Sequence, residues 1–98
     1  MRLSRLKPNR WSVRADELDH RGRPAVVCRN GDREFFFGRG VRGGKQVWIC
    51  WERKRLFLSR TLVPPERRDA EQALSIAEPE LKRIDPDSEV YLDLASES

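Results

Sequence analysis

EFFFGRGVRGGKQVWICW, residues 34–51, contains five of the eight Phe, Trp and Tyr residues of this 98-residue chain. Aromatic and β-branched residues favour strands, and the glycines between the two apolar runs supply the positive φ angles that tight turns require. The stretch therefore predicts two antiparallel strands, over residues 33–37 and 46–53, joined by a hairpin connection.

A phosphate-binding loop is the main alternative for the glycine-rich segment, residues 38–46. Such a loop needs a glycine where Arg39 stands, and a serine or threonine where Gln46 follows Lys45. It must also lead into a helix, whereas this segment leads into a strand-like run. Turn glycines explain the segment better, and a basic contact loop built on Arg39, Arg42 and Lys45 remains open.

The strand pattern continues on both sides of this hairpin. Residues 11–18 alternate apolar and polar, and Asn30-Gly31 separates two strand-like runs, which is a strong sequence indication of a hairpin. Residues 52–55, ERKR, indicate a charged turn before a further apolar run. The predicted strands cover residues 11–18, 25–28, 33–37, 46–53 and 56–62.

A helix is predicted after a pair of prolines, residues 64 and 65, that ends the last of these strands. Pro65 suits the first helical turn, where its missing N–H costs nothing, and Glu66 and Asp69 carry the charge that the helix dipole favours there. Pro79 is expected to kink or interrupt the helix. Apolar residues recur at intervals of three and four and predict one buried stripe, formed by Ala70, Ala73, Leu74, Ala77, Leu81 and Ile84.

These elements predict an α+β fold in a single domain. A mostly antiparallel meander of five to six strands carries one Pro-interrupted helix packed across it, and a C-terminal strand joins the sheet. The expected parts are a basic N-terminal arm (1–10), the meander (11–62), the helix (64–84), the last strand (89–94) and a frayed tail (95–98).

The net charge of +4 hides an uneven distribution. Residues 1–60 contain 16 Lys and Arg against 6 Asp and Glu, a net of +10, whereas residues 61–98 contain 4 against 10, a net of −6. A basic half of this kind can attract nucleic acid, anionic lipid or an acidic protein surface, or can simply keep sheet edges soluble. Since no apolar run approaches the roughly 18 residues of a membrane span, we expect a soluble, cytoplasmic domain.

Catalytic and metal-binding constellations are weak in this sequence. His20 is the one histidine, so it cannot complete a four-ligand zinc site with Cys28 and Cys50, and no side chain is obviously placed to activate it. One acidic turn lacks the ligand number and the glycine of a calcium loop; it contains Asp85, Asp87 and Glu89. We expect no enzyme activity, metal or cofactor. Buried thiols are the prediction for the cysteines, and a disulfide is the alternative.

The segments LVPPERR (62–68), ELKRIDP (80–86) and EVYLD (89–93), with an Ala- and Leu-rich helix between the first two, carry a resemblance. Their order resembles a stretch of the cytoplasmic part of the type II secretion L-type protein and of the related type IV pilus assembly proteins of the PilN and PilM kind. The resemblance covers residues from about Gln46 to Asp93. Asp85 stands where those proteins usually have a threonine, and Pro79 breaks a helix that they leave whole.

The resemblance implies a non-enzymatic interaction domain of a secretion or pilus assembly platform at the inner membrane. Its partner would be the cytoplasmic assembly ATPase or another platform subunit, and a homodimer is also open. That family has a membrane helix, so the resemblance implies either an excised cytoplasmic fragment, tethered to the inner membrane in a longer protein, or a minimal homologue. The residues expected to contact the partner are Arg53, Lys54, Arg55, Arg67, Arg68, Glu71, Lys82 and Arg83.

Nucleic-acid binding is the alternative function, as in a small phage- or plasmid-type regulator. Arginines and glycines stand beside strands rich in aromatic residues, and exposed aromatic rings beside arginines can stack on bases while the guanidinium groups hold phosphates. The candidate contacts are Arg39, Arg42 and Lys45. The same aromatic residues, 35–37, Trp48 and Trp51, are also the best core formers of a small domain, and the sequence leaves open which role they have.

Overall fold

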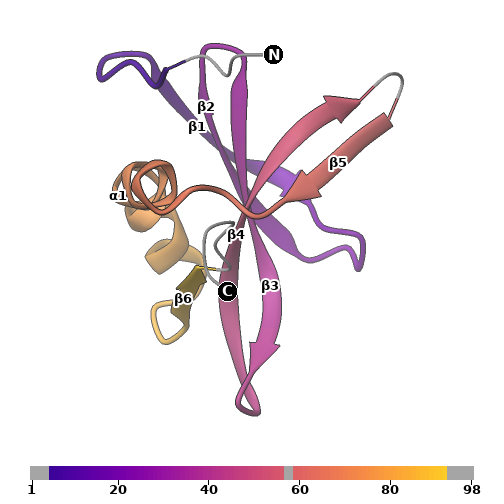
Figure 1. The fold of residues 1–98 in the computed structure, drawn as a ribbon. Coiled ribbons are helices and arrows are strands. Elements are labelled where there is room, and N and C mark those ends of the chain that lie inside the picture. Colours follow the sequence, from indigo (N-terminus) through magenta and orange to yellow (C-terminus); the bar gives the residue numbers. More distant parts are fainter. Residues whose placement is uncertain (1–4, 57–58, 93–98) are drawn as a thin grey trace.

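The computed structural model describes residues 5–56 and 59–92. It contains one six-stranded sheet and one helix, which confirms the α+β prediction (Figure 1). Five strands form an antiparallel meander in chain order, and the sixth pairs in parallel with the fourth. The elements are β1 (Trp11–Leu18), β2 (Pro24–Asn30), β3 (Arg33–Arg42), β4 (Lys45–Leu56), β5 (Ser59–Val63), α1 (Arg67–Ile84) and β6 (Glu89–Leu92).

Strand β4 is the centre of the sheet. One of its edges pairs with β3 from Lys45 to Arg53. Its other edge is shared, because β6 pairs with residues 47–50 and β5 pairs with residues 52–56. A parallel partner needs a long connection, and α1 provides it by carrying the chain back across the sheet.

The glycine-rich segment is strand for most of its length, contrary to the predicted connection over residues 38–46. Only Gly43 and Gly44 form the turn, with φ angles of 58° and 77°, as a tight two-residue hairpin requires. Gly38 and Gly40 lie within β3, where neighbouring side chains leave no room for a Cβ atom. A Cβ atom on Gly40 would lie 2.2 Å from Cδ1 of Ile49, and one on Gly38 would lie 2.8 Å from the ring of Phe36.

The predicted charged turn at residues 52–55 is also wrong, because β4 continues through it to Leu56. Charged residues fit inside this strand because partners neutralise them: Glu52 is 4% exposed and receives two hydrogen bonds of 2.8 Å from Arg33. Strand β5 correspondingly begins at Ser59, later than predicted, and residues 57–58 lie outside the described part of the chain.

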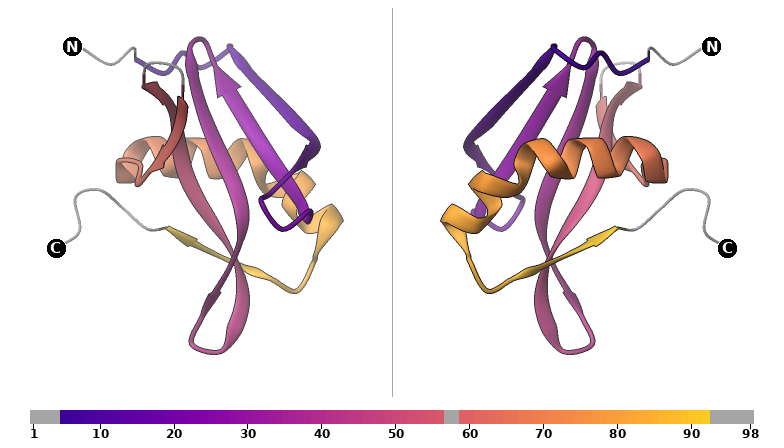
Figure 2. Two further views of the ribbon diagram at one scale, coloured as in Figure 1. Left: turned by 90° about the vertical axis from the view of Figure 1, so that its right-hand side faces the viewer. Right: turned by 90° about the vertical axis from the view of Figure 1, so that its left-hand side faces the viewer.

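Helix α1 covers one face of the sheet (Figure 2). Its four buried residues, Ala70, Ala73, Ala77 and Leu81, belong to the predicted stripe, and Leu74 and Ile84 pack beside them half-buried. The helix starts at Arg67 rather than at residue 64, and it continues through Pro79, so the predicted interruption does not occur. Figure 2 shows its final part bending away from the line of its first turns, as a proline inside a helix favours.

A buried ion cluster fixes α1 to the sheet. Arg33 on β3 donates two hydrogen bonds to Glu52 and a third, also of 2.8 Å, to Asp69 in the first turn of α1. The side chains of these three residues are 7%, 5% and 15% exposed. The hydrogen bonds from Arg33 to Glu52, and then the one to Asp69, raise the pKa of the Arg33 guanidinium, so Arg33 stays charged in this buried position.

The two cysteines are free thiols on the α1 side of the sheet. Cys28 lies on β2 and Cys50 on β4, with β3 between them. Two strand spacings separate their backbones by about 10 Å, beyond the reach of a disulfide. Burial raises the pKa of Cys28 to about 12, and its Sγ donates to the carbonyl of Ala73 at 3.7 Å.

From Arg5 onward, the N-terminal arm contacts the sheet through Lys7 and Leu6. Asn30, which is 2% exposed, accepts a hydrogen bond from the N–H of Lys7 at 2.9 Å and donates one to the carbonyl of Lys7 at 2.7 Å. Leu6 packs beside the core under α1. These contacts hold the described part of the arm against the end of β2.

Candidate functional site

The face of the sheet opposite α1, called the uncovered face below, carries the alternate side chains of each strand. At its centre lies a small apolar cluster of Ala25, Val27 and Phe36, with Trp51 half-buried against it. Strand pairing places Leu62 beside Arg53 and Arg60 beside Arg55 on this same face. Apolar and basic side chains therefore adjoin here without a covering helix.

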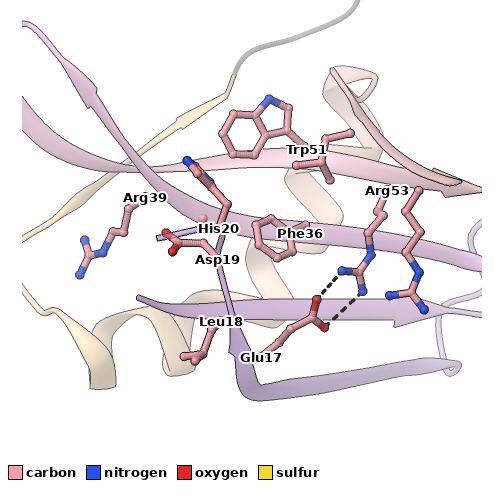
Figure 3. Close-up of a pocket in the computed structure, with 11 residues that line it drawn as sticks. Glu17, Leu18, Asp19, His20, Phe36, Arg39, Trp51 and Arg53 are labelled. Carbon is pink, nitrogen blue, oxygen red and sulfur yellow. Dashed lines mark hydrogen bonds and ion pairs between the residues drawn. The ribbon is translucent and has the colours of Figure 1, made fainter. Parts of the chain in front are cut away.

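A hollow of about 520 Å³ opens on the uncovered face. We call it the aromatic hollow; it is lined by Glu17, Leu18, Asp19, His20, Phe36, Gly38, Arg39, Trp51, Arg53, Arg60 and Leu62. Figure 3 shows Phe36 near its centre, with Trp51 and His20 on one side and Arg53 on the other. Its volume lies in the range of sites for small organic groups.

Gly38 helps to keep the hollow open. A Cβ atom at this position would lie 2.8 Å from Phe36 and 3.6 Å from the ring of Trp51. Leu62, which is 44% exposed, forms part of the wall, whereas Leu18, 61% exposed, borders the hollow with its side chain turned away from Phe36 (Figure 3). Large exposed apolar side chains around an aromatic floor are suited to contact a flat, partly apolar ligand.

A β-bulge places Glu17 at this site. The pairing of β1 with β2 shifts register just before Glu17; strict alternation from Ala15, which packs toward α1, would have put Glu17 on the covered side. Here it accepts hydrogen bonds from Nη1 and Nη2 of Arg53, drawn as dashed lines in Figure 3. Nε of Arg53 donates to Glu34 at 3.1 Å.

Both carboxylates of the hollow are held by arginines. Hydrogen bonds from Arg53 lower the pKa of Glu17 against the opposing effect of burial. Burial alone would raise the pKa of Asp19, but the backbone N–H groups of Arg23 and Arg21 and the Arg23 side chain hydrogen-bond to it and lower the pKa. Neither carboxylate is therefore an uncompensated negative charge that would repel an anion.

A second depression, of about 270 Å³, adjoins the aromatic hollow and shares Arg53 and Arg60 with it. We call it the basic pocket; its lining residues are Arg29, Asp32, Glu34, Arg53, Lys54, Arg55 and Arg60. Glu34 is bound by Arg53. Within residues 5–56 and 59–92, Arg29, Arg55 and Arg60 form no ion pair, and Arg29 donates to the carbonyl of Gly31. Lys54 also forms no ion pair there, but it stands between Arg53 and Arg55, so its side chain points to the other face of the sheet.

Two of these arginines stand directly opposite each other. Arg55 and Arg60 are cross-strand partners on β4 and β5, and like charges in this arrangement destabilise a strand pair. A bound anion between the two guanidinium groups would remove that repulsion and accept their hydrogen bonds. The basic pocket is thus built to accept negative charge.

The side chains of the three loop residues predicted to contact nucleic acid point away from the two depressions. Arg39 points toward the α1 side, stacks 3.9 Å from the ring of Trp48 and donates hydrogen bonds of 2.8 Å to Asp85 and Ser88. Figure 3 shows its guanidinium turned away from the aromatic hollow. Arg42 lies over the ring of Tyr91 at 4.9 Å, and Lys45 is exposed at the end of the β3–β4 hairpin.

The eight residues predicted to dock a partner protein fall on two surfaces. Arg67, Arg68, Glu71, Lys82 and Arg83 are exposed on α1. Lys82 forms an ion pair with Glu78 at 3.8 Å, and Arg83 forms one with Glu80 at 2.7 Å. Arg53, Lys54 and Arg55 belong to the basic pocket instead.

Sequence reasoning missed Arg29 and Arg60 as parts of this site. The register of the β4–β5 pairing places Arg60 opposite Arg55. Because a turn was predicted at residues 52–55, that pairing could not be recognised from the sequence. Of the aromatic residues left open, Phe35, Phe37 and Trp48 are fully buried on the α1 side, Phe36 is 7% exposed, and Trp51 is the half-exposed one.

The acidic turn after α1 is occupied by contacts within the chain. Asp85 accepts hydrogen bonds from Ser88 and Arg39 and from the N–H of Asp87, and these lower its pKa. Among the described residues, no group of three His, Cys, Asp or Glu side chains is arranged to hold a metal ion. Nor does the described chain contain a helix long and apolar enough to cross a membrane.

Comparison of the chain with models of known families, with curated proteins and with solved structures finds no significant match.

Proposed function

We propose that this protein binds nucleic acid through the uncovered face, without catalysing a reaction. The observation that carries the proposal is the basic pocket, in which Arg29, Arg55 and Arg60 line one depression of the uncovered face and form no ion pair with a carboxylate among the described residues. Such a cluster beside an aromatic surface matches the chemistry of a sugar–phosphate backbone with attached bases.

The charge distribution supports the same partner. The excess of 16 basic over 6 acidic residues lies in the first 60 residues, which form most of the sheet, whereas α1 carries four residues of each sign. The basic charge is therefore concentrated on the sheet rather than spread around the molecule. A polyanion would be attracted toward the sheet from a distance as well as bound by it.

Salt dependence gives a quantitative test. If about three cations of the pocket contact phosphates, the logarithm of the association constant for a single strand should fall with the logarithm of salt concentration with a slope of about −2. The measurement is fluorescence anisotropy of short labelled oligonucleotides, single-stranded and duplex, titrated with the full chain at several salt concentrations.

The matching variant is Arg55→Gln with Arg60→Gln. We expect binding about tenfold weaker at low salt and a salt slope smaller by about 1.4. Removing the mutual repulsion of the two arginines should leave the fold intact or stabilise it. The control is Arg68→Gln with Lys82→Gln, which removes the same charge from α1; an equal loss in this control, or no binding by the natural chain at low salt, would refute the proposal.

Protein docking remains a second proposal, based on the resemblance to secretion and pilus platform proteins. The exposed residues Arg67, Arg68, Glu71, Lys82 and Arg83 on α1 would contact the assembly ATPase or a platform subunit. This surface lacks the apolar centre of a typical interface, since the exposed large apolar side chains of the described chain, Leu18, Val41, Leu62 and Tyr91, all lie on strands. The variant of Arg68 and Lys82 tests it directly, because it should abolish co-purification with such an ATPase.

A further inference from the structure

We infer that the aromatic hollow is a subsite for one unpaired base, so that the protein prefers single-stranded to duplex nucleic acid. This inference rests on the proposed function and assigns a separate role to each depression: the basic pocket holds phosphates, and the aromatic hollow holds a base.

The floor of the hollow has the chemistry of a stacking platform. Trp51 is half-buried against Phe36, so its ring is supported from within the sheet and still reaches the surface. Gly38 leaves the space beside the two rings unfilled. Every base has a π face that can stack on such a ring.

The two depressions lie close enough together for one to hold a base and the other to hold the phosphates next to it. They share Arg53 and Arg60, and Trp51 stands four residues before Arg55 on the same strand, about 13 Å at the rise of a β-strand. A base stacked on Trp51 thus has the phosphates next to it within reach of Arg55 and Arg60. The strand of nucleic acid would run along β4.

The shape of the hollow favours an unpaired base. Leu62, Asp19 and His20 border the hollow beside the rings, so a base that stacks on Trp51 has to lie within the hollow. A duplex can place a base there only after unpairing and unstacking it, which costs free energy that a single strand does not spend. The carboxylates at the rim, Glu17 and Asp19, are held by arginines and do not oppose an approaching phosphate.

The test compares Trp51→Leu with Trp51→Phe in the full chain. Leucine keeps an apolar side chain but removes the stacking face, so the affinity for a single-stranded oligonucleotide should fall about tenfold, while the affinity for the matching duplex and the salt slope should change little. Phenylalanine should retain most of the affinity. Oligodeoxynucleotides and oligoribonucleotides of one sequence are titrated in parallel. A preference for single strand over duplex that depends on Trp51 supports the inference, and the type of oligonucleotide that shows it tells whether the ligand is DNA or RNA.

A second readout needs no variant. Trp48 is fully buried and Trp11 packs on the α1 side, so Trp51 is the tryptophan that a ligand in the hollow can touch. Single strands should quench part of the tryptophan emission at saturation, and duplexes should quench it less. Binding of single strands without quenching, or an unchanged ratio of single-strand to duplex affinity in Trp51→Leu, would overturn the base subsite. The proposed function would still stand if Arg55→Gln with Arg60→Gln weakens binding, and it fails separately if neither nucleic acid binds.

Discussion

Replacing Arg33 with methionine should cost far more stability than replacing an arginine that holds a carboxylate at the surface. Arg33 donates three hydrogen bonds of 2.8 Å to Glu52 and Asp69 in the interior. Without it, Glu52 remains a buried carboxylate, 5% exposed, with no compensating cation. Breaking a buried pair in this way costs about 3–5 kcal/mol, a large part of the roughly 5–15 kcal/mol that stabilises a domain.

The matched control is Arg83→Met. Arg83 also donates two hydrogen bonds to one carboxylate, at 2.7 and 2.9 Å from Glu80, but its side chain is 63% exposed. Water screens such a pair, so its loss should cost less than about 1 kcal/mol. The comparison therefore separates the effect of burial from the effect of bond geometry.

Urea unfolding followed by circular dichroism measures the difference. At a slope of about 1.5 kcal/mol per molar urea, the midpoint should fall by about 2–3 M in Arg33→Met and by under about 0.7 M in Arg83→Met. Adding Glu52→Leu to Arg33→Met should restore part of the loss, because an apolar side chain needs no counter-charge. Equal midpoints for the two single variants would refute the reasoning.

Three further outcomes follow from the same structure. Gly40→Ala should lower the unfolding free energy by about 1–3 kcal/mol because its Cβ would overlap Ile49, and Ile49→Val should recover part of this in urea unfolding; an unchanged midpoint would contradict the close contact. Hydrogen bonds from Arg53 lower the pKa of Glu17 from 4.5 in the folded state. The stabilising contribution of Glu17 is therefore complete above about pH 4.5 and is lost as the pH falls through the folded pKa. Glu17→Gln should flatten the acid part of a plot of unfolding free energy against pH, and an identical acid profile would count against the ion pair. Cys28, whose pKa burial raises to about 12, should react with a thiol reagent at pH 8 only as fast as the chain unfolds, and rapid labelling of the native protein would contradict that burial.

The sequence was sufficient where local patterns and tertiary packing agree. The hairpin between β3 and β4 and the alanine stripe of α1 both follow from short-range rules, and both are present, although the turn is confined to Gly43 and Gly44. The same rules failed at residues 52–55, where four charged residues read as a turn but lie inside β4. What makes Glu52 acceptable there is Arg33, 19 residues away in sequence, and no local pattern contains that information.

The candidate site was only partly predictable for a related reason. The basic character of the first 60 residues and the presence of aromatic strands were visible, and they suggested nucleic acid as an alternative partner. Which arginines are available depends on ion pairs across the sheet: Arg39 is bound by Asp85, whereas Arg60 faces Arg55. The bulge that turns Glu17 toward Arg53 is likewise a property of strand pairing and not of either residue.

The position of α1 after the meander has a consequence for synthesis on the ribosome. The five antiparallel strands emerge first, and their pairings are between neighbours in the chain, so the meander can assemble early. Until α1 follows, one side of that nascent sheet presents Phe35, Phe37 and Trp48 to water. Translation that stops before Arg67 would release a product with a bare aromatic surface, which we expect to precipitate or to be captured by chaperones.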